Sequence, residues 1–192
     1  MMDVVGAALL LVLAAPVLLV ASLGIVFLDG RPIIHRRRVL GLGGEEFDAF
    51  KLRSMVVGAD AQLARSPELL VAFERNFKLD NDPRVTRLGA WLRRWSIDEL
   101  PQLVNVLRGE MSLVGPRMIT ANEAEKYGAF ARELITLRPG LTGLWQVSGR
   151  QLVDYAERVR LDREYVANWT FLRDLKIALL TPLVVVSARG AK

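Results

Sequence analysis

The sequence predicts an α/β fold that is mostly helical and is carried on an N-terminal membrane anchor. Three observations lead to this prediction. The segment from Val4 to Leu28 contains no charged residue, several later segments repeat apolar residues at helical spacing, and two short runs flank a glycine pair as hairpin strands would. Apolar residues make up 52% of the chain, an excess for a soluble domain. We therefore expect an anchor over residues 1–30 and a folded domain over residues 31–192.

The uncharged segment is long enough to be a membrane helix, because it would extend roughly 37 Å. Pro16 lies near its centre, where it removes one backbone donor and disfavours a continuous helix. Two arrangements satisfy these facts, a kinked transmembrane helix or a re-entrant hairpin of two short helices. The basic cluster Arg36–Arg38 would mark the cytoplasmic side and lie near lipid headgroups, or it could simply be the solvated face of a strand.

A small β-hairpin is expected directly after the anchor. Its strands would cover residues 33–39 and 47–52, with Gly43-Gly44 in the turn. Two amphipathic helices suited to a membrane surface follow later in the chain. The segment 88–95 places apolar side chains, two of them tryptophans, at helical spacing, and the segment 171–180 is also helical in pattern. Each apolar face could meet lipid or pack into a protein core.

The most informative segment begins at Ser96 and reads Ser-Ile-Asp-Glu-Leu-Pro-Gln-Leu. Apolar residues between positions 100 and 107 follow one helical face, which places Asp98 and Glu99 in the first turn of a helix that ends at Gly109. Two adjacent carboxylates near the positive end of a helix dipole could be catalytic residues. Ser96 and Glu99 could instead form a capping box.

Several cations lie at places suited to binding phosphate. Arg117 follows a Gly-Pro turn, and Arg150 ends a glycine-rich block that starts at Arg138, in which Pro139-Gly140 predicts a type II turn and the other glycines allow close approach to a ligand. Guanidinium groups match phosphate oxygens, although structural salt bridges are the common alternative. Lys51 and Arg53, at the end of the second hairpin strand, could also assist or could pair with the nearby acidic residues Glu45 and Glu46.

Composition narrows the function classes. The net charge of +5 is compatible with nucleic-acid binding, but no helix-turn-helix, finger or RNA-binding pattern is present, and lipid and nucleotide phosphates explain the charge equally well. Cysteine is absent, which excludes disulfides and thiolate chemistry. His35 is the only histidine, lies far from the carboxylates in sequence, and is expected to be structural.

The run Asp98 to Leu103 and the segment Ser112 to Arg117 resemble the signature of the bacterial sugar transferases, the monotopic phosphoglycosyl transferases. The blocks 138–150 and 160–166 resemble further motifs of that family, so the likeness covers nearly the whole chain. The resemblance implies a re-entrant anchor broken at Pro16, with the catalytic domain at the cytoplasmic face of the bacterial inner membrane.

The resemblance also implies a reaction. A sugar-1-phosphate would pass from a UDP-sugar to polyprenyl (undecaprenyl) phosphate with release of UMP, as the first membrane step of glycoconjugate synthesis. Asp98 would attack the sugar-bearing phosphate and form an aspartyl phosphosugar, which the polyprenyl phosphate then attacks. Glu99 would position or deprotonate the acceptor. Mg²⁺ is the implied cofactor, with Asp98 as its protein ligand, because the charge of a diphosphate must be neutralised.

The residues expected to bind substrate, directly or by supporting others, are Lys51, Arg53, Arg117, Gln146, Arg150 and Asp162. The sequence from Leu144 to Arg150 resembles that of the hexose-1-phosphate transferases more than that of the acetamido-sugar-1-phosphate transferases. The implied partners are a UDP-sugar, polyprenyl phosphate and membrane lipids, without nucleic acid, and a homo-oligomer is compatible with the sequence. Two rival functions are a catalytically inert membrane-bound scaffold and a membrane-tethered nucleic-acid-binding module. The intact carboxylates and arginines favour the enzyme.

Overall fold

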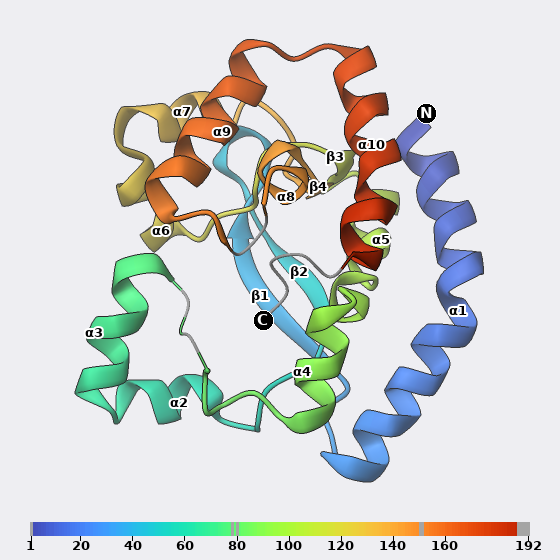
Figure 1. Ribbon diagram of the computed structural model, residues 1–192, viewed down its shortest axis with the longest axis vertical. Coiled ribbons are helices and arrows are strands. Elements are labelled where there is room, and N and C mark those ends of the chain that lie inside the picture. The colour runs from blue at the N-terminus through green and yellow to red at the C-terminus, as the bar shows by residue number, and fades with distance from the viewer. Residues whose placement is uncertain (1, 78, 80, 150–151, 188–192) are drawn as a thin grey trace.

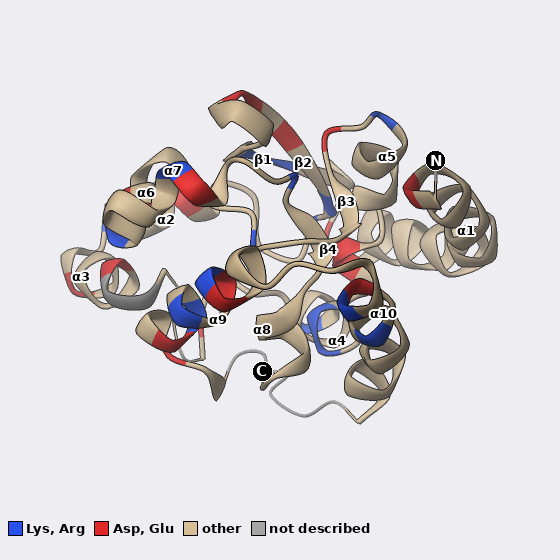
Figure 2. Cartoon of the chain, turned by 90° about the horizontal axis from the view of Figure 1, so that it is seen from above, with Lys and Arg blue, Asp and Glu red and all other residues tan. Residues whose placement is uncertain are grey.

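A long N-terminal helix, α1 (Met2–Leu28), runs along one side of the folded domain in the computed structural model of the chain (Figure 1). The structure describes residues 2–77, 79, 81–149 and 152–187. Within this part, α1 is the one helix that is long and apolar enough to cross a membrane. Much of its apolar surface is uncovered, since Val12 is 71% exposed and Val20 is 70% exposed. Figure 2 shows that charged residues are almost absent from α1 and are spread over the rest of the chain.

The helix α1 continues through Pro16 without interruption, so two separate helices are not observed. Protein contacts lie on both sides of the proline. Ala7 belongs to a core cluster with residues of helix α5 (Gln102–Leu107), and Ala21 and Ile25 belong to a second cluster with Leu92. Docking on both sides of Pro16 offsets the missing backbone hydrogen bond. A re-entrant path through the bilayer stays a prediction.

The predicted hairpin is confirmed. Strands β1 (Ile34–Leu40) and β2 (Glu46–Leu52) pair antiparallel, and the short 3₁₀ turn η1 (Leu42–Gly44) joins them. Gly43 and Gly44 both have positive φ angles, of 70° and 84°, which glycine adopts without strain. Val39 and Ala49 on one face of the hairpin are buried against α5, so the hairpin is fixed on the domain through that face.

The two adjacent carboxylates, Asp98 and Glu99, lie in a short turn that precedes helix α5 and is separate from it. Helices α2 (Ala59–Ala64), α3 (Pro67–Asn76) and α4 (Arg87–Arg94) precede it. Asp98 and Glu99 lie in a separate 3₁₀ turn, η2 (Ile97–Glu99), and not in the first turn of α5 as predicted. Ser96 has a left-handed φ of 55° and Pro101 cannot donate a backbone hydrogen bond, so the α-helical pattern starts only after the proline. The end of α5 agrees with the prediction, because Gly109 has a φ of 76°.

The second half of the chain is built on a two-stranded parallel sheet. Strand β3 (Ser112–Val114) pairs with β4 (Gly140–Thr142). Around it lie the segments α6 (Ala121–Tyr127), η3 (Gly128–Phe130), α7 (Ala131–Leu134), α8 (Leu144–Val147), α9 (Tyr155–Ala167) and α10 (Phe171–Val186) (Figure 1). The structure thus has the mostly helical composition with small sheets that the sequence predicts.

The prediction of a turn at Pro139-Gly140 is wrong, because Gly140 is the first residue of β4. A Cβ atom on Gly140 would lie 2.1 Å from the backbone nitrogen of Gly115, and one on Gly143 would lie 2.1 Å from the carbonyl oxygen of Gly115. These glycines therefore let two segments of the chain's own backbone approach each other. The sequence had suggested a close approach to a ligand.

The two predicted amphipathic helices divide their apolar residues between core and surface. In α4, Leu92 is completely buried beside α1, whereas Trp91 is 53% exposed. In α10, Ile177 is buried, whereas Leu172, Leu179 and Leu183 form an outer apolar stripe. Both helices thus combine packing on the protein with an outward apolar face.

Candidate active site

Asp98 is a buried carboxylate at the junction between the anchor and the domain. Its residue is 6% exposed, and the preceding Ile97 packs with Ala21 and Ile25 of α1. Burial and the adjacent charge of Glu99 raise the pKa of Asp98 to about 6, while Lys51 and Arg93 act in the opposite direction. A carboxylate of this kind is still mostly ionised at neutral pH, and it is more basic than an ordinary one.

Lys51 lies beside the carboxylates. Its Nζ is 2.6 Å from Oε1 of Glu99, although the two residues are far apart in sequence. The sequence had offered Glu45 and Glu46 as its acidic partners, but Glu46 pairs with Arg38 at 3.2 Å instead. Lys51 points from β2 toward η2, so the hairpin supplies a cation to the carboxylate turn.

His35, which is expected from the sequence to be structural, lies on the hairpin next to a cation of the site. His35 faces Lys51 directly across the hairpin. Burial lowers the pKa of His35, and Lys51, Arg37 and Arg93 lower it further, whereas Asp60 raises it. The imidazole is therefore a neutral neighbour of the cations near Asp98. Arg93, which donates a hydrogen bond to Ser54 at 2.8 Å, is a member of this group that sequence reasoning missed.

Arg117 belongs to a second group of polar residues around α9. Its guanidinium carbon lies 4.8 Å from the ring centroid of Trp145, and its backbone N–H donates to Oδ1 of Asp162 at 3.1 Å. Oδ2 of Asp162 accepts from the hydroxyl of Tyr127 at 2.8 Å. Asp162 thus positions the turn that carries Arg117. Its own burial raises the pKa of Asp162 to about 6, although these hydrogen bonds oppose the rise.

Arg37 connects the two groups. It forms an ion pair with the fully buried Glu123 at 2.7 Å. Burial lowers the pKa of Arg37, as does the nearby charge of Arg117, whereas Glu123 and Glu99 raise it. The hairpin thus contacts both groups, because Arg37 on β1 pairs with Glu123 and Lys51 on β2 pairs with Glu99. The sequence left the cluster Arg36–Arg38 open between the membrane surface and the solvated face of a strand, and the structure instead places Arg37 in a partly buried ion pair.

The remaining predicted residues differ in their surroundings. Arg53 is buried and donates to the carbonyl oxygens of Asp29 and Gly30, both at 2.7 Å, so its guanidinium fastens the linker that follows the anchor. Gln146 has a buried Oε1 without a hydrogen-bond partner among the described residues. Arg150 lies outside the residues that the structure describes.

The carboxylate pair fits a magnesium ion better than a metal held by protein alone. No group of three or more metal-binding side chains occurs in the described part of the chain. Mg²⁺ commonly uses one or two carboxylates and takes its other oxygen ligands from water and substrate phosphates. Asp98 and Glu99 offer that donor set.

Comparison with known proteins now identifies the family. A family model described as bacterial sugar transferase matches residues 1–188. The chain belongs to the bacterial sugar transferase family. It is 42% identical over 193 residues to the undecaprenyl-phosphate galactose phosphotransferase of Salmonella typhimurium, over 98% of this chain and 40% of that protein. It is also 42% identical over 193 residues to the exopolysaccharide production protein ExoY of Rhizobium meliloti, over 98% of this chain and 85% of that protein.

A third relative is the UDP-glucose:undecaprenyl-phosphate glucose-1-phosphate transferase of Caulobacter vibrioides, 44% identical over 188 residues that cover 94% of this chain and 66% of that protein. This chain therefore spans less than half of the Salmonella relative and most of the Rhizobium one. The family predicted from the sequence is confirmed. The names of these bacterial sugar transferases agree with the predicted class of enzyme, a phosphoglycosyl transferase.

Proposed function

We propose that this bacterial sugar transferase moves a hexose-1-phosphate from a UDP-sugar to undecaprenyl phosphate, with release of UMP, at the cytoplasmic face of the inner membrane. The observation that carries the proposal is the buried Asp98 beside Glu99 and Lys51, one residue from the packing contact between Ile97 and α1. A nucleophile next to the anchor can meet a phosphate at the headgroup level. The names of the Salmonella and Caulobacter relatives support galactose or glucose as the hexose.

The proposed chemistry has two displacements at one phosphorus atom. An oxygen of Asp98 attacks the phosphorus that bears the sugar, and the bond from this phosphorus to UMP breaks, so that UMP leaves with the bonding electrons. A phosphate oxygen of the acceptor then attacks the same phosphorus, and the bond to Asp98 breaks. The raised basicity of Asp98 strengthens it as a nucleophile, and the split replaces one difficult transfer by two easier ones.

The residues around Asp98 would divide the other tasks. Asp98 and Glu99 would hold Mg²⁺, which supplies charge neutralisation for the diphosphate when it is bound. Lys51 keeps Glu99 in place and lowers the repulsion between the two carboxylates. Glu99 would orient the acceptor phosphate or take a proton from it. Arg117 would bind the donor phosphates, for which its planar fork is suited.

A re-entrant anchor is part of this proposal. Near the N-terminus of α1, Asp3 accepts hydrogen bonds from the hydroxyl of Ser112 and the backbone N–H of Leu113. Just beyond its C-terminus, Asp29 accepts from the hydroxyl of Thr86 at 2.8 Å. Both ends of the anchor thus contact the same folded domain. Because a charged domain cannot lie in hydrocarbon, this arrangement favours an anchor that keeps both ends on one side of the membrane.

The experiment that tests the function is a transfer assay with the full chain in detergent or nanodiscs. UDP-galactose or UDP-glucose, undecaprenyl phosphate and Mg²⁺ should give UMP and a lipid-linked sugar diphosphate. Absence of UMP with every UDP-hexose, from a protein that is folded and membrane-bound, would favour the inert scaffold instead.

A further inference from the structure

Four buried hydrogen-bond donors cluster near Arg117 without a partner among the described residues. They are Nε of Arg117, Nε1 of Trp145, Oη of Tyr155 and Nε of Arg158. A buried donor that makes no hydrogen bond costs roughly 1–3 kcal/mol, so native structures seldom keep several together. All four atoms can donate, and three of them can only donate. Such a cluster is matched to a ligand that is rich in acceptor oxygens.

Arg158 lies at the centre of this cluster, although no role was predicted for it from the sequence. Its residue is 4% exposed, and its guanidinium carbon lies 4.7 Å from the ring centroid of Trp145 and 5.4 Å from that of Tyr155. The guanidinium carbon of Arg117 lies 4.8 Å from the same Trp145 centroid. One indole ring therefore contacts both guanidinium groups and fixes their relative placement.

The carboxylates of Glu123 and Asp162 lie near enough to act on the two arginines, but neither is within ion-pair distance of them. Burial and, after it, the nearby charge of Arg117 lower the pKa of Arg158 to about 10. The neighbouring carboxylate of Glu123 already pairs with Arg37 at 2.7 Å. Neither Arg117 nor Arg158 forms an ion pair with a carboxylate in the described ranges. Two buried cations that repel each other would be stabilised by a multiply charged anion.

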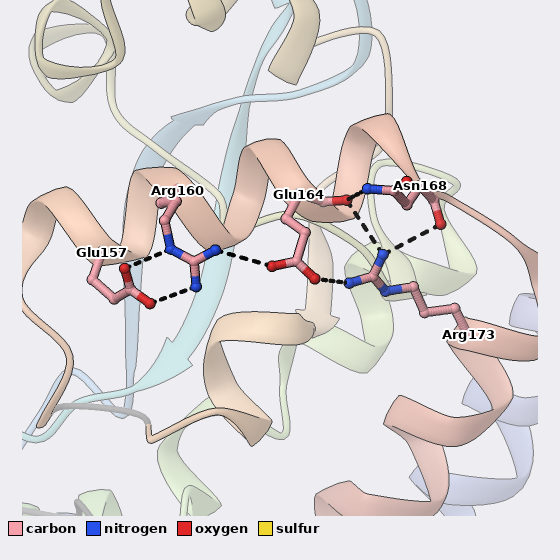
Figure 3. Close-up of polar contacts among 5 residues, drawn as sticks. All are labelled: Glu157, Arg160, Glu164, Asn168 and Arg173. Atoms are coloured by element: carbon pink, nitrogen blue, oxygen red, sulfur yellow. Dashed lines mark hydrogen bonds and ion pairs between the residues drawn. The ribbon is translucent and has the colours of Figure 1, made fainter.

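On the outer face of helix α9, Arg160 differs from Arg158 because it pairs with carboxylates. Arg160 donates to both carboxylate oxygens of Glu157, at 2.7 and 2.6 Å, and to Glu164 at 3.2 Å. Glu164 in turn pairs with Arg173, which also donates to the backbone of Asn168 (Figure 3). Helix α9 thus provides acidic partners for Arg160, which is one of its exposed arginines. Its buried arginine has none among the described residues.

We propose that Arg158 is a phosphate-binding residue, which together with Arg117 holds the diphosphate of the nucleotide donor, while Trp145 sets the spacing of the two guanidinium groups. This inference rests on the proposed function, because it assigns the arginine cluster to the donor of that reaction. The hairpin links this diphosphate site to the carboxylate turn, since its two strands carry the ion pairs of Arg37 with Glu123 and of Lys51 with Glu99. Tyr155 also lines an open hollow of about 560 Å³, together with Lys126 and Asp154.

The test compares Arg158→Gln with Arg160→Gln, which removes the same charge from the outer face of the same helix. Binding of UDP, inorganic pyrophosphate and uridine to the full chain in detergent is measured by calorimetry. Arg158→Gln should weaken UDP and pyrophosphate at least tenfold, leave uridine unchanged and raise KM for the UDP-sugar more than it lowers kcat. Arg160→Gln should bind all three ligands like wild type.

A second variant keeps the test decisive if the glutamine change prevents folding. Arg158→Lys keeps the charge but loses the planar fork, and it should weaken pyrophosphate by an intermediate factor. Wild-type affinity for pyrophosphate in a folded Arg158 variant would overturn the proposal, as would a wild-type protein that binds neither UDP nor pyrophosphate. A wild-type protein that binds pyrophosphate through Arg158 but releases no UMP would refute the proposed function alone.

Discussion

The Nζ of Lys51 lies 2.6 Å from Oε1 of Glu99, which ties the second strand of the hairpin to the turn that carries Asp98. The pair joins residues that are 48 positions apart in the sequence. It therefore depends on the tertiary fold, and it places one cation beside two adjacent carboxylates. The finding leads directly to a first prediction.

Lys51→Met should lower the rate of UMP release at least tenfold. Without the ammonium group, the two carboxylates repel each other more strongly and Glu99 loses its orientation. Stability should change little, because a partly exposed ion pair contributes only about 0.2–1 kcal/mol. The measurement is UMP release together with the melting temperature in detergent. Lys51→Arg, which keeps the charge, should retain part of the activity. Equal rates for the methionine variant and wild type would remove Lys51 from the site.

The buried carboxyl of Asp162 should make stability depend on pH. Its pKa is about 6 in the folded protein and about 3.9 in an unfolded chain. Between these values the folded state holds a proton that the unfolded state has lost, so its stabilising contribution is full below pH 4 and is lost as the pH rises through 6. The contribution is on the order of 3 kcal/mol. Melting temperatures at pH 4.5 and 7 should therefore differ more for wild type than for Asp162→Asn. Parallel pH curves for the two proteins would contradict the assignment.

Gly140→Ala should destabilise the domain by roughly 3 kcal/mol, as overpacking does. The added Cβ atom would lie 2.1 Å from the backbone nitrogen of Gly115 and 2.3 Å from the carbonyl oxygen of Thr142, and neither can move without breaking the β3–β4 pair. Gly24→Ala is the matched control, since its Cβ atom would meet only a side-chain atom of Leu88 at 3.3 Å. Thermal unfolding in detergent compares the two variants. Similar melting temperatures would show that the sheet tolerates the clash.

The anchor should keep its N-terminus on the cytoplasmic side. A cysteine placed at Met2 of this cysteine-free chain should react with an impermeant reagent from the cytoplasmic side of oriented vesicles. In a Pro16→Ala background, some molecules should become reactive from the opposite side, because the alanine favours a straight spanning helix. If the cysteine at position 2 of the chain that keeps Pro16 is labelled only from outside, α1 crosses the bilayer.

The sequence predicted those features that depend on neighbouring residues. The hairpin was predicted from the two short runs that flank Gly43-Gly44, and the end of α5 was predicted from Gly109. The turn at Pro139-Gly140 was predicted wrongly because pairing with β3 overrides the local preference of the dipeptide. The position of His35 opposite Lys51 could not be predicted, because only the hairpin register brings the two residues together.

Arg158 was also missed, although a signal for it exists in the sequence. Arg158, Asp162 and Tyr165 recur at helical spacing, and all three are buried on the inner face of α9. Charged residues on the face of a helix that also carries core residues are unusual, so this pattern could have marked the arginine. That Glu123 pairs with Arg37 and not with Arg158 could not be read from the sequence, because it depends on the tertiary fold.

The identity of the nucleophile is tested most directly by intact-mass analysis of the protein incubated with UDP-hexose and Mg²⁺ but no acceptor. Wild type should gain the mass of one hexose phosphate, lose it when undecaprenyl phosphate is added, and yield a peptide modified at Asp98. Asp98→Asn should show no adduct and no UMP release. Asp48→Asn, which removes a carboxylate paired with Arg38 at 3.5 Å on the hairpin, should behave like wild type. An Asp98→Asn protein that forms the adduct, or releases UMP at the wild-type rate, would contradict the account.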